Sequence, residues 1–269
     1  MGLHAVVLLK QVLDPEIPFK RFAIDPETKR PAAGIASEVL GPFEMSALEV
    51  ALQLKDAGGV EKITALAAGP PSAQESLRKA LSVRADEAVL LNTDDLGELD
   101  PHQTAELLAA AIKTIDAVDL VMAGRQAGDW DHGQTGYLIA ERLGWPCLSF
   151  AQNAAVAEGM LKIRREFGGG WEFLAVPPPA VVTVTNHDTN VLRTARLPDL
   201  MKARRRSVTQ WDPADVGLDP ASLAGAAAAE VLDVRIPPEK ETDCEFIRAT
   251  EPAEAAAQLV RRLQELKVL

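Results

Sequence analysis

The amino-acid sequence predicts an α/β fold, in which a mostly parallel sheet is flanked by helices in a three-layer arrangement. Short apolar runs recur along the first half of the chain, and stretches with helical periodicity separate them. This alternation is the βαβ pattern of a parallel sheet covered by helices. With 269 residues, 47% of them hydrophobic, the chain is long enough to bury a large core.

Four strands and four helices are expected before residue 146. Gly58 and Gly59 follow the first helical stretch, where a left-handed residue favours helix termination. Pro71 and Ser72 supply a start signal for the second helix. We expect strands at residues 5–9, 62–67, 87–91 and 120–123, and helices within 43–59, 70–83, 100–115 and 137–143.

The pattern changes after residue 146. Three short alternating runs, at residues 148–156, 160–167 and 171–176, are separated by glycines and predict antiparallel strands. A further apolar run at 180–185 predicts one more buried strand. Together with the parallel strands, these runs predict a mixed sheet.

The last part of the chain shows too little apolar pattern for a second core. Prolines interrupt nearly every run from about residue 186, although apolar residues at helical spacing predict a final helix within 251–269. We therefore expect two parts, an α/β domain at 1–187 and an extended C-terminal arm at 188–269 that packs on a partner.

Charge and cysteine content exclude several classes of protein. The formal net charge of -11 argues against binding to nucleic acid or to an anionic membrane surface. Cys147 and Cys244 lie far apart, outside any disulfide or zinc spacing, which favours a reduced, cytoplasmic protein. The apolar run at 5–9 is too short for a signal peptide or a membrane insertion.

A glycine-rich stretch, residues 124–136 (GRQAGDWDHGQTG), joins the strand at 120–123 to the following helix. Ligands bind at the carboxyl ends of parallel strands, where three loops of this chain begin, at residues 9–16, 67–74 and 123–136. Glycines allow backbone N–H groups to approach a phosphate, and the helix start adds a partial positive charge.

The polar residues of this stretch leave two interpretations open. Gln134 and Thr135 could donate to a phosphate, while Asp129 and Asp131 could bind ribose hydroxyls, shape the turn or cap the helix. The alternative is a glycine-rich turn with an Asx cap and no ligand. Neither a G-x-G-x-x-G motif nor a P-loop is present, so a nucleotide would be held in another way.

No catalytic or metal-binding motif stands out. The four histidines are scattered, without an H-E-x-x-H motif or a nucleophile elbow, so we expect no catalytic residue and no metal ligand. A basic run, Lys202, Arg204 and Arg205 with Arg206, follows Leu197. Such a run is either a solvated face or a docking element, in which Leu197 inserts into a partner and the basic residues face acidic groups.

Several blocks, in order along the whole chain, resemble the beta subunit of electron-transfer flavoproteins. They are LLKQVLDPE, GPFEMSALEVALQLKD, AAGPPSAQESLRKALSVRADEAVLL, GRQAGDWDHGQTGYLIAERLGWP and RLPDLMKARRR. The resemblance implies a heterodimer with an FAD-binding alpha subunit and a fold of the adenine-nucleotide-binding α/β type. It implies an electron carrier subunit, not an enzyme, that relays electrons from acyl-CoA-type dehydrogenases of fatty acid oxidation to a quinone reductase.

The resemblance also implies a cofactor site and a docking site. AMP would be a structural ligand, and the redox-active FAD would be shared with the alpha subunit. Leu197, Lys202, Arg204 and Arg205 would engage partner dehydrogenases. The nucleotide-binding residues carried over by position are Leu8, Leu40, Gly41, Pro42, Phe43, Ala68, Gly124, Arg125, Gln126, Ala127, Gly128, Asp129, Trp130, Asp131, His132, Gly133, Gln134 and Thr135.

The sequence departs from the family pattern at two of these places. Gly41 stands where the family usually has asparagine, and residues 129–133 replace an Asp-Asp-Asp-Cys-Asn segment. Two alternatives stay open. In bifurcating relatives a second FAD occupies the AMP site and NADH is the donor, and the KQVLDPE start is similar to that branch. A stand-alone adenine-nucleotide-binding protein of like architecture would need no alpha subunit.

Overall fold

The computed structural model describes residues 2–238 and 244–269. The chain forms two compact units, one that ends at Asp233 and one that spans Val234–Leu269. The sequence predicted a boundary between residues 187 and 188, beyond which the chain would pack on a partner protein. Since no partner chain is part of the structure, that boundary stays a prediction. Within this chain, residues 188–233 belong to the first unit.

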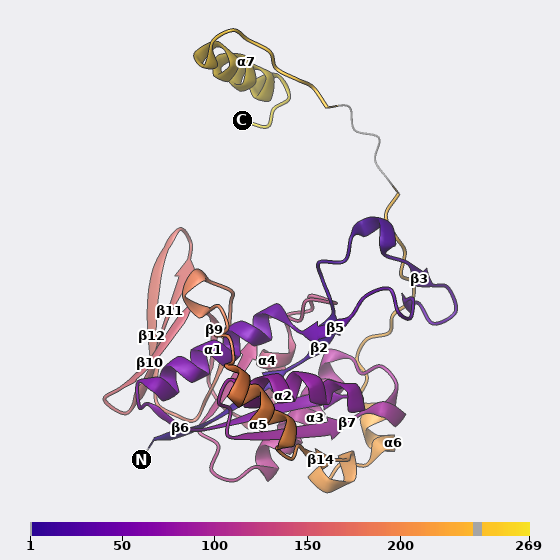
Figure 1. Cartoon of the computed structure of the whole chain (residues 1–269), viewed down its shortest axis with the longest axis vertical. Coiled ribbons are helices and arrows are strands. Elements are labelled where there is room, and N and C mark those ends of the chain that lie inside the picture. Colours follow the sequence, from indigo (N-terminus) through magenta and orange to yellow (C-terminus); the bar gives the residue numbers. More distant parts are fainter. Residues whose placement is uncertain (1, 239–243) are drawn as a thin grey trace. The chain divides into compact units, whose positions relative to one another are not determined.

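A central sheet of seven parallel strands forms the middle layer of the first unit (Figure 1), in the order β14-β7-β6-β1-β8-β13-β9. The four strands expected in the first half are confirmed, as is the buried strand at 180–185. The short strand β14 at the edge was not predicted. The bounds are β1 (Leu3–Leu9), β6 (Val60–Gly69), β7 (Glu87–Asn92), β8 (Leu120–Gly124), β9 (Cys147–Ala151), β13 (Ala180–Val184) and β14 (Thr209–Trp211).

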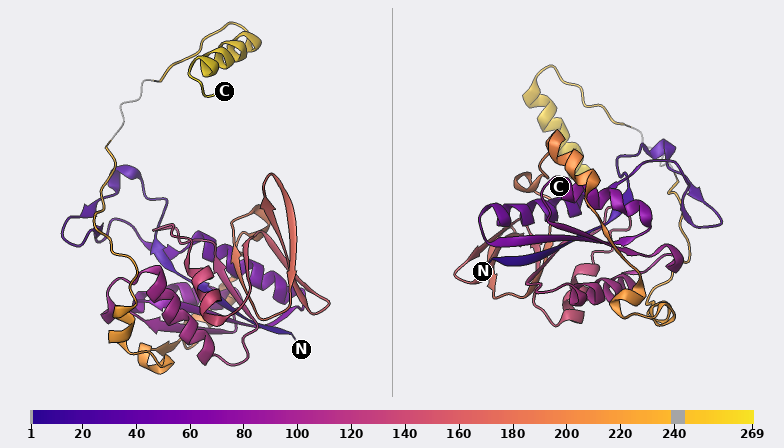
Figure 2. Two further views of the ribbon diagram at one scale, coloured as in Figure 1. Left: turned by 180° about the vertical axis from the view of Figure 1, so that it is seen from behind. Right: turned by 60° about the horizontal axis from the view of Figure 1, so that its bottom comes forward.

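Helices cover both faces of this sheet (Figure 2), which confirms the α/β fold with flanking helices. Alternate residues of a strand point to opposite faces. Val7 of β1 accordingly packs in one buried cluster with α1 and α2, whereas Val6 packs in another with α3 and α4. The bounds are α1 (Pro42–Asp56), α2 (Gln74–Ser82), α3 (Pro101–Thr114) and α4 (Thr135–Leu143).

Two further helices lie later along the first unit, where none had been predicted. Helix α5 (Leu197–Arg205) packs on α2, and α6 (Pro220–Gly225) packs on α3. The 3-10 helices are η1 (Phe19–Arg21), η2 (Pro71–Ala73), η3 (Asp94–Leu96), η4 (Asp188–Asn190) and η5 (Pro213–Val216).

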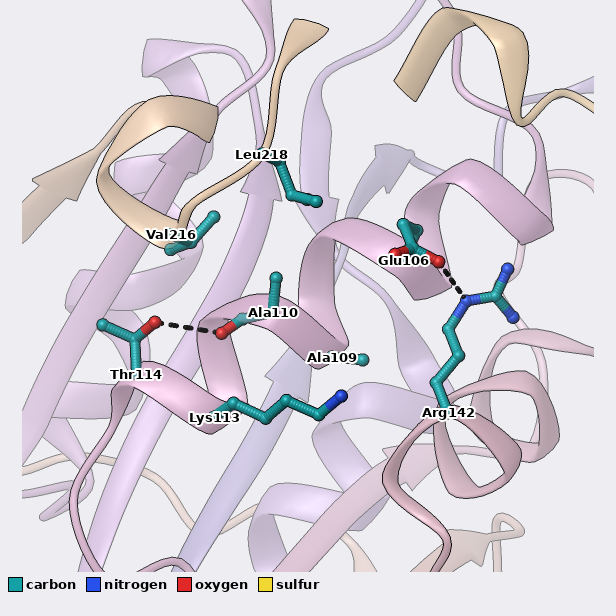
Figure 3. A pocket seen from close by; sticks show the side chains of 8 residues that line it. All are labelled: Glu106, Ala109, Ala110, Lys113, Thr114, Arg142, Val216 and Leu218. Atoms are coloured by element: carbon teal, nitrogen blue, oxygen red, sulfur yellow. Dashed lines mark hydrogen bonds and ion pairs between the residues drawn. The ribbon is translucent and has the colours of Figure 1, made fainter. Parts of the chain in front are cut away.

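A shallow hollow of about 430 Å³ lies on the outer side of α3, where α4 and the end of η5 approach it (Figure 3). Its main polar feature is the ion pair between Arg142 Nε and Glu106 Oε2, at 2.7 Å. It does not include a strand end or any residue predicted for the nucleotide site.

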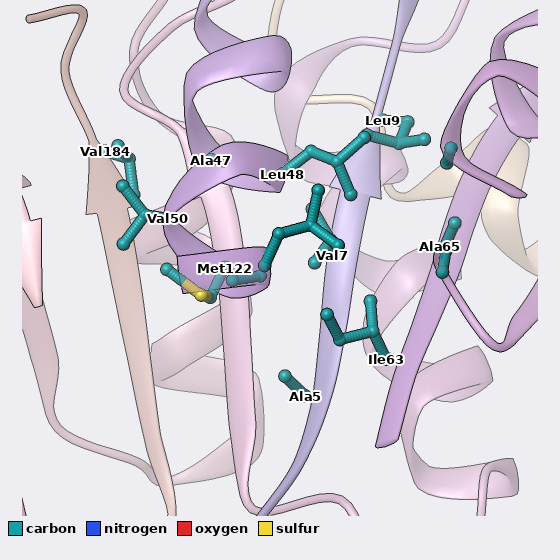
Figure 4. Close-up of a cluster of buried hydrophobic side chains, with 14 of the residues drawn as sticks. Ala5, Val7, Leu9, Ala47, Leu48, Val50, Ile63, Ala65, Met122 and Val184 are labelled. Carbon is teal, nitrogen blue, oxygen red and sulfur yellow. The ribbon is translucent and has the colours of Figure 1, made fainter. Parts of the chain in front are cut away.

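The larger of the two side-chain clusters is centred on α1 (Figure 4). Leu48 is fully buried and lies over β1, beside Val7 and Met122. Small residues such as Ala47 and Ala51 on the same helix bring its backbone close to the sheet. The start of α1 is thereby held near the carboxyl ends of β1 and β8.

The antiparallel strands form a separate three-stranded sheet, so the mixed sheet predicted from the sequence is wrong in this respect. The run at 148–156 divides at Gln152, with its first half in the parallel sheet as β9 and its second half in the antiparallel sheet as β10. Two small ladders, β2–β5 and β3–β4, are also antiparallel. The bounds are β2 (Gln11–Leu13), β3 (Ile24–Asp25), β4 (Arg30–Pro31), β5 (Glu38–Leu40), β10 (Asn153–Ala157), β11 (Met160–Phe167) and β12 (Gly170–Val176).

The second unit contains the predicted final helix, α7 (Pro252–Glu265). None of its residues is buried, and Leu259 and Val260 are exposed. Within the described residues, no helix is both long and apolar enough to cross a membrane.

The order of the strands creates a switch point between β1 and β8. From β1 the chain steps outward to β6 and then β7, and α3 carries it back to β8 on the other side of β1. The connections that leave β1 and β8 therefore diverge and open a crevice at the carboxyl edge of the sheet, where ligands bind in open α/β folds.

Substitution of Leu48 by alanine tests the role of α1 in the core. Removal of this fully buried side chain is expected to lower the free energy of unfolding by about 2–5 kcal/mol, because burial is lost and a cavity remains. Urea denaturation followed by circular dichroism measures this change. The exposed Leu266 supplies the control, since its alanine variant should differ from wild type by at most about 0.5 kcal/mol. Equal losses of unfolding free energy in the two variants would contradict the assignment of Leu48 to the core.

Candidate functional site

A cavity of about 670 Å³ opens at the switch point. Its walls include the ends of β1, β6 and β8, the glycine-rich stretch 124–136 and the first residues of α3 and α4. We call it the switch-point cavity. Its volume is within the usual range for small-molecule sites, about 300–1,000 Å³.

Most of the residues predicted for the nucleotide site line this cavity. Those that do are Leu8, Ala68, Gly124, Arg125, Gln126, Ala127, Asp129, Trp130, His132, Gly133, Gln134 and Thr135. The remaining predicted residues, Leu40, Gly41, Pro42, Phe43, Gly128 and Asp131, are not part of the lining. The role of all of them in ligand binding stays a prediction.

Three glycines of the stretch have a reason in the packing of the protein itself. A Cβ at Gly124 would lie 2.8 Å from the Cβ of Phe43 and 3.0 Å from the backbone nitrogen of Glu44. One at Gly136 would lie 2.6 Å from Thr183 Cγ2. A Cβ at Gly128 would come within 3.3 Å of Pro42. The first turn of α1 is thus seated against the end of β8, which explains why residues 42 and 43 lie behind the cavity wall.

The two aspartates of the stretch bond within the protein. Asp129 Oδ2 lies 2.6 Å from the Nζ of Lys10, and its Oδ1 accepts a hydrogen bond from the N–H of Trp130. Asp131 has a positive φ of 52° and accepts from Gln126 Nε2 at 2.6 Å. Both contacts shape the turn, which is one of the roles expected from the sequence.

The start of α4 is turned toward the cavity. Gln134 is the N-cap residue, and its side chain accepts no hydrogen bond from the first turn. Thr135 and Gly136 begin the helix and line the cavity. The first N–H groups of a helix have no partner within the helix and carry a partial positive charge, so they favour an anionic group at this place.

Arg125 is held between two aromatic rings. Its guanidinium carbon lies 4.8 Å from the centre of the Phe43 ring and 5.8 Å from that of Phe150. Its Nε is buried and has no hydrogen-bond partner among the described residues. The side chain therefore brings a positive charge to the cavity wall with donor capacity to spare.

Glu44, in the first turn of α1, was missed by the sequence analysis. It lines the cavity and is 6% exposed. Its removal from water raises the pKa of its carboxyl group to about 8. A hydrogen bond from its own backbone N–H and the charge of Lys10 oppose this shift, and Asp129 adds to it. An acidic residue early in a helix is common, so no sequence pattern indicated that this one is buried.

The segment after α6 forms another part of the cavity wall that the sequence analysis did not predict. Ala227, Ala229, Glu230 and Val231 line the cavity. The carboxylate of Asp100 holds this segment, because its Oδ2 accepts from the backbone N–H groups of Ala228 and Ala229 at 2.6 and 2.9 Å. We call residues 226–232 the covering segment.

The residues predicted for docking lie on one helix, α5, away from the cavity. Leu197 begins this helix and is 72% exposed, and Met201, one turn on, is also exposed. Lys202, Arg204 and Arg205 occupy its last turn, where positive charges are favourable. Arg78 Nη1 donates to the backbone oxygens of Ala203, Arg204 and Arg206, so the C-terminal end of α5 is fastened to α2.

Comparison with known proteins assigns the chain to a family. Residues 36–216 match the electron transfer flavoprotein domain. The chain is 33% identical to the caffeyl-CoA reductase-Etf complex subunit CarD of Acetobacterium woodii over 99% of this chain and all of that protein. It is 32% identical to the human electron transfer flavoprotein subunit beta over 98% of both chains. It is 33% identical to protein FixA of Azorhizobium caulinodans over 98% of this chain and 96% of that protein.

The chain therefore belongs to the electron transfer flavoprotein family. Within that family it is of the beta-subunit type, as the resemblance of its sequence blocks had implied.

Substitution of Gly124 by alanine tests the seat of α1 on β8. The added Cβ would meet the Phe43 Cβ and the α1 backbone, so the free energy of unfolding is expected to fall by about 1–3 kcal/mol. Gly225, in α6, is the matched control, because a Cβ there meets nothing within 4 Å. Thermal and urea denaturation would then show no loss for Gly225→Ala. A Gly124→Ala variant as stable as wild type would refute the close approach.

The pH dependence of stability tests the burial of Glu44. With a pKa of about 8 in the folded chain, against 4.5 as the ordinary value, the folded state keeps a proton that the unfolded chain has released. The free energy of unfolding of the nucleotide-free protein should therefore fall as the pH rises from the ordinary pKa of 4.5 to the raised pKa of about 8. The contribution approaches about 1.4 kcal/mol per pH unit, and Glu44→Gln should remove it. Urea denaturation at several pH values measures both slopes, and parallel slopes would contradict the prediction.

Proposed function

We propose that this chain is the beta subunit of a heterodimeric electron-transfer flavoprotein and that it binds AMP in the switch-point cavity as a structural ligand. The redox-active FAD is shared with an alpha subunit. Electrons pass from acyl-CoA-type dehydrogenases, through this flavin, to a quinone reductase. The chain is a carrier subunit in fatty acid oxidation, with no catalytic side chain and no metal of its own.

The observation that carries the AMP site is the convergence of three strand ends and a helix start on one cavity. The N–H groups at the start of α4 suit a phosphate, and the Nζ of Lys10 lies close by, paired with Asp129. Leu8 and Ala68, at the ends of β1 and β6, offer an apolar floor for a planar base. FAD, when bound with the alpha subunit, would supply the electron-transfer chemistry, while this chain's residues position the ligand and the partners.

Two surfaces support the partner assignments. On α5, exposed Leu197 stands at one end and a basic last turn at the other, a combination that suits docking to dehydrogenases with acidic groups around an apolar pocket. In the second unit, α7 has exposed apolar residues and none buried, so it has apolar surface to offer the alpha subunit. We propose that the complex works in the cytoplasm, where Cys147 and Cys244 stay reduced as the free thiols seen in the structure.

A second candidate function is flavin-based bifurcation, with a second FAD in place of AMP and NADH as donor. The extent of the cavity favours it, since the lining continues past the glycine-rich stretch to Arg30, Glu98 and the covering segment. The name of the Acetobacterium woodii relative describes that protein as a subunit of a complex with a reductase. A stand-alone nucleotide-binding protein, the third candidate, leaves the apolar residues of α7 without a role.

Ligand analysis of the purified complex decides among these candidates. Co-expression with the neighbouring alpha-subunit gene should yield a heterodimer that releases about one FAD and one AMP on denaturation, as quantified by chromatography. About two FAD and no AMP would favour bifurcation. A stable monomer without flavin would contradict the whole proposal.

A further inference from the structure

Glu44 holds a position in α1 that its local structure does not explain. It is the third residue of the helix, where a glutamate commonly accepts a hydrogen bond from the backbone N–H of the N-cap residue. Here that N–H belongs to Gly41 and already donates to the backbone oxygen of Lys10, at 3.0 Å. Glu44 Oε2 is buried and has no hydrogen-bond partner within the described residues. The carboxyl group therefore does not cap the Gly41 N–H, and its only backbone donor within the described residues is the N–H of Glu44 itself.

The residue before the helix leaves room for this carboxyl group. A Cβ at Gly41 would lie 2.0 Å from Glu44 Oε2 and 2.8 Å from its Cδ. The backbone of Gly41 has φ -56°, which any residue can adopt, so no backbone conformation requires glycine there. Gly41 thus leaves the space that the Glu44 carboxyl group occupies at the edge of the cavity.

The charged groups around Glu44 do not stabilise its ionised form enough to offset its burial. Lys10, at the end of β1, faces it but is paired with Asp129 of the glycine-rich stretch at 2.6 Å. Arg125, from the same stretch, is held over the ring of Phe43. Since burial outweighs these charges, the raised pKa leaves Glu44 mostly neutral at pH 7. A neutral carboxyl group carries an O–H donor.

We propose that Glu44, in its neutral form, donates a hydrogen bond to an acceptor atom of the nucleotide in the switch-point cavity, so that nucleotide binding depends on a proton held by this side chain. The proposal deepens the proposed function and rests on it. The acceptor is an oxygen or nitrogen of an adenine nucleotide, a chemistry that AMP and the adenylate half of FAD share. When Glu44 is ionised, binding must first take up a proton from solvent, because a carboxylate has no donor and repels an anionic ligand.

The test is the pH dependence of AMP affinity. The full-length chain, purified with its co-expressed partner subunit and freed of nucleotide, is titrated with AMP by calorimetry from about pH 7.5 to about pH 9.5. In this range the phosphate of AMP is fully ionised, since a phosphate monoester has its second pKa near 6. Wild-type affinity is expected to fall by up to about tenfold per pH unit above about pH 8. Glu44→Gln, which keeps an N–H donor at every pH, should bind AMP with a flat profile.

A matched variant controls for the change of charge. Glu158, on the turn between β10 and β11, is exposed and does not line the cavity. Among the residues that the structure describes, it pairs only with Lys162, across that turn. Glu158→Gln therefore removes the same charge and should keep the wild-type slope. A second measurement needs no variant: calorimetry in buffers of different ionisation enthalpy should show a net uptake of protons when AMP binds at about pH 8.5.

The outcomes separate this inference from the proposed function. AMP binding with no proton uptake, or a slope that persists in Glu44→Gln, would overturn the role of Glu44 and leave the nucleotide site standing. If the wild-type complex bound neither AMP nor FAD at any pH, the proposed function would fall and this inference with it. If FAD alone bound, with the same pH profile, the donor role would be supported for the bifurcating alternative.

Discussion

The contact between the first turn of α1 and the carboxyl end of β8 is the constraint on which the site depends. Because Gly124 has no side chain, Phe43 and the backbone of Glu44 come within van der Waals distance of the strand. This single approach determines the position of three features at once: the ring against which Arg125 lies, the buried carboxyl group of Glu44, and the direction in which residues 124–136 leave the sheet. The alanines of α1 and the burial of Leu48 make the approach possible, so the core and the site share one geometric requirement.

The sequence was sufficient to predict five strands of the central sheet, β1, β6, β7, β8 and β13. Strands such as β13 are buried along their whole length and therefore appear as continuous apolar runs, and the helices between them show their buried face at helical spacing. The prediction was less complete where structure depends on tertiary contacts. Strand β14 is three residues long and largely exposed, so no periodicity marked it. The division of one apolar run into β9 and β10 arises from a change of sheet at Gln152, which local pattern does not reveal.

The candidate site was predictable in the same uneven way. The glycine-rich stretch was recognisable from its place between a strand and a helix, but the reason for several of its glycines was not, because Gly136 makes room for Thr183, a residue far along the chain. Glu44 and the covering segment depend on burial and on the position of Asp100, which only the folded chain provides. Helix α5 was not predicted, because Pro198 had been interpreted as an interruption, whereas it lies in the first turn of the helix. The far end of α5 is anchored by Arg78, which links residues more than a hundred positions apart.

The covering segment connects two properties that are otherwise separate. Val231 lines the cavity, and the second unit begins shortly afterwards, at Val234. Asp100 holds the backbone of this segment and also caps α3. One carboxylate therefore joins the cavity wall to a helix that covers one face of the central sheet. A protein that bound the second unit would restrain the chain only a few residues from the cavity wall. Partner binding and the shape of the switch-point cavity would then be linked through a few residues of one backbone.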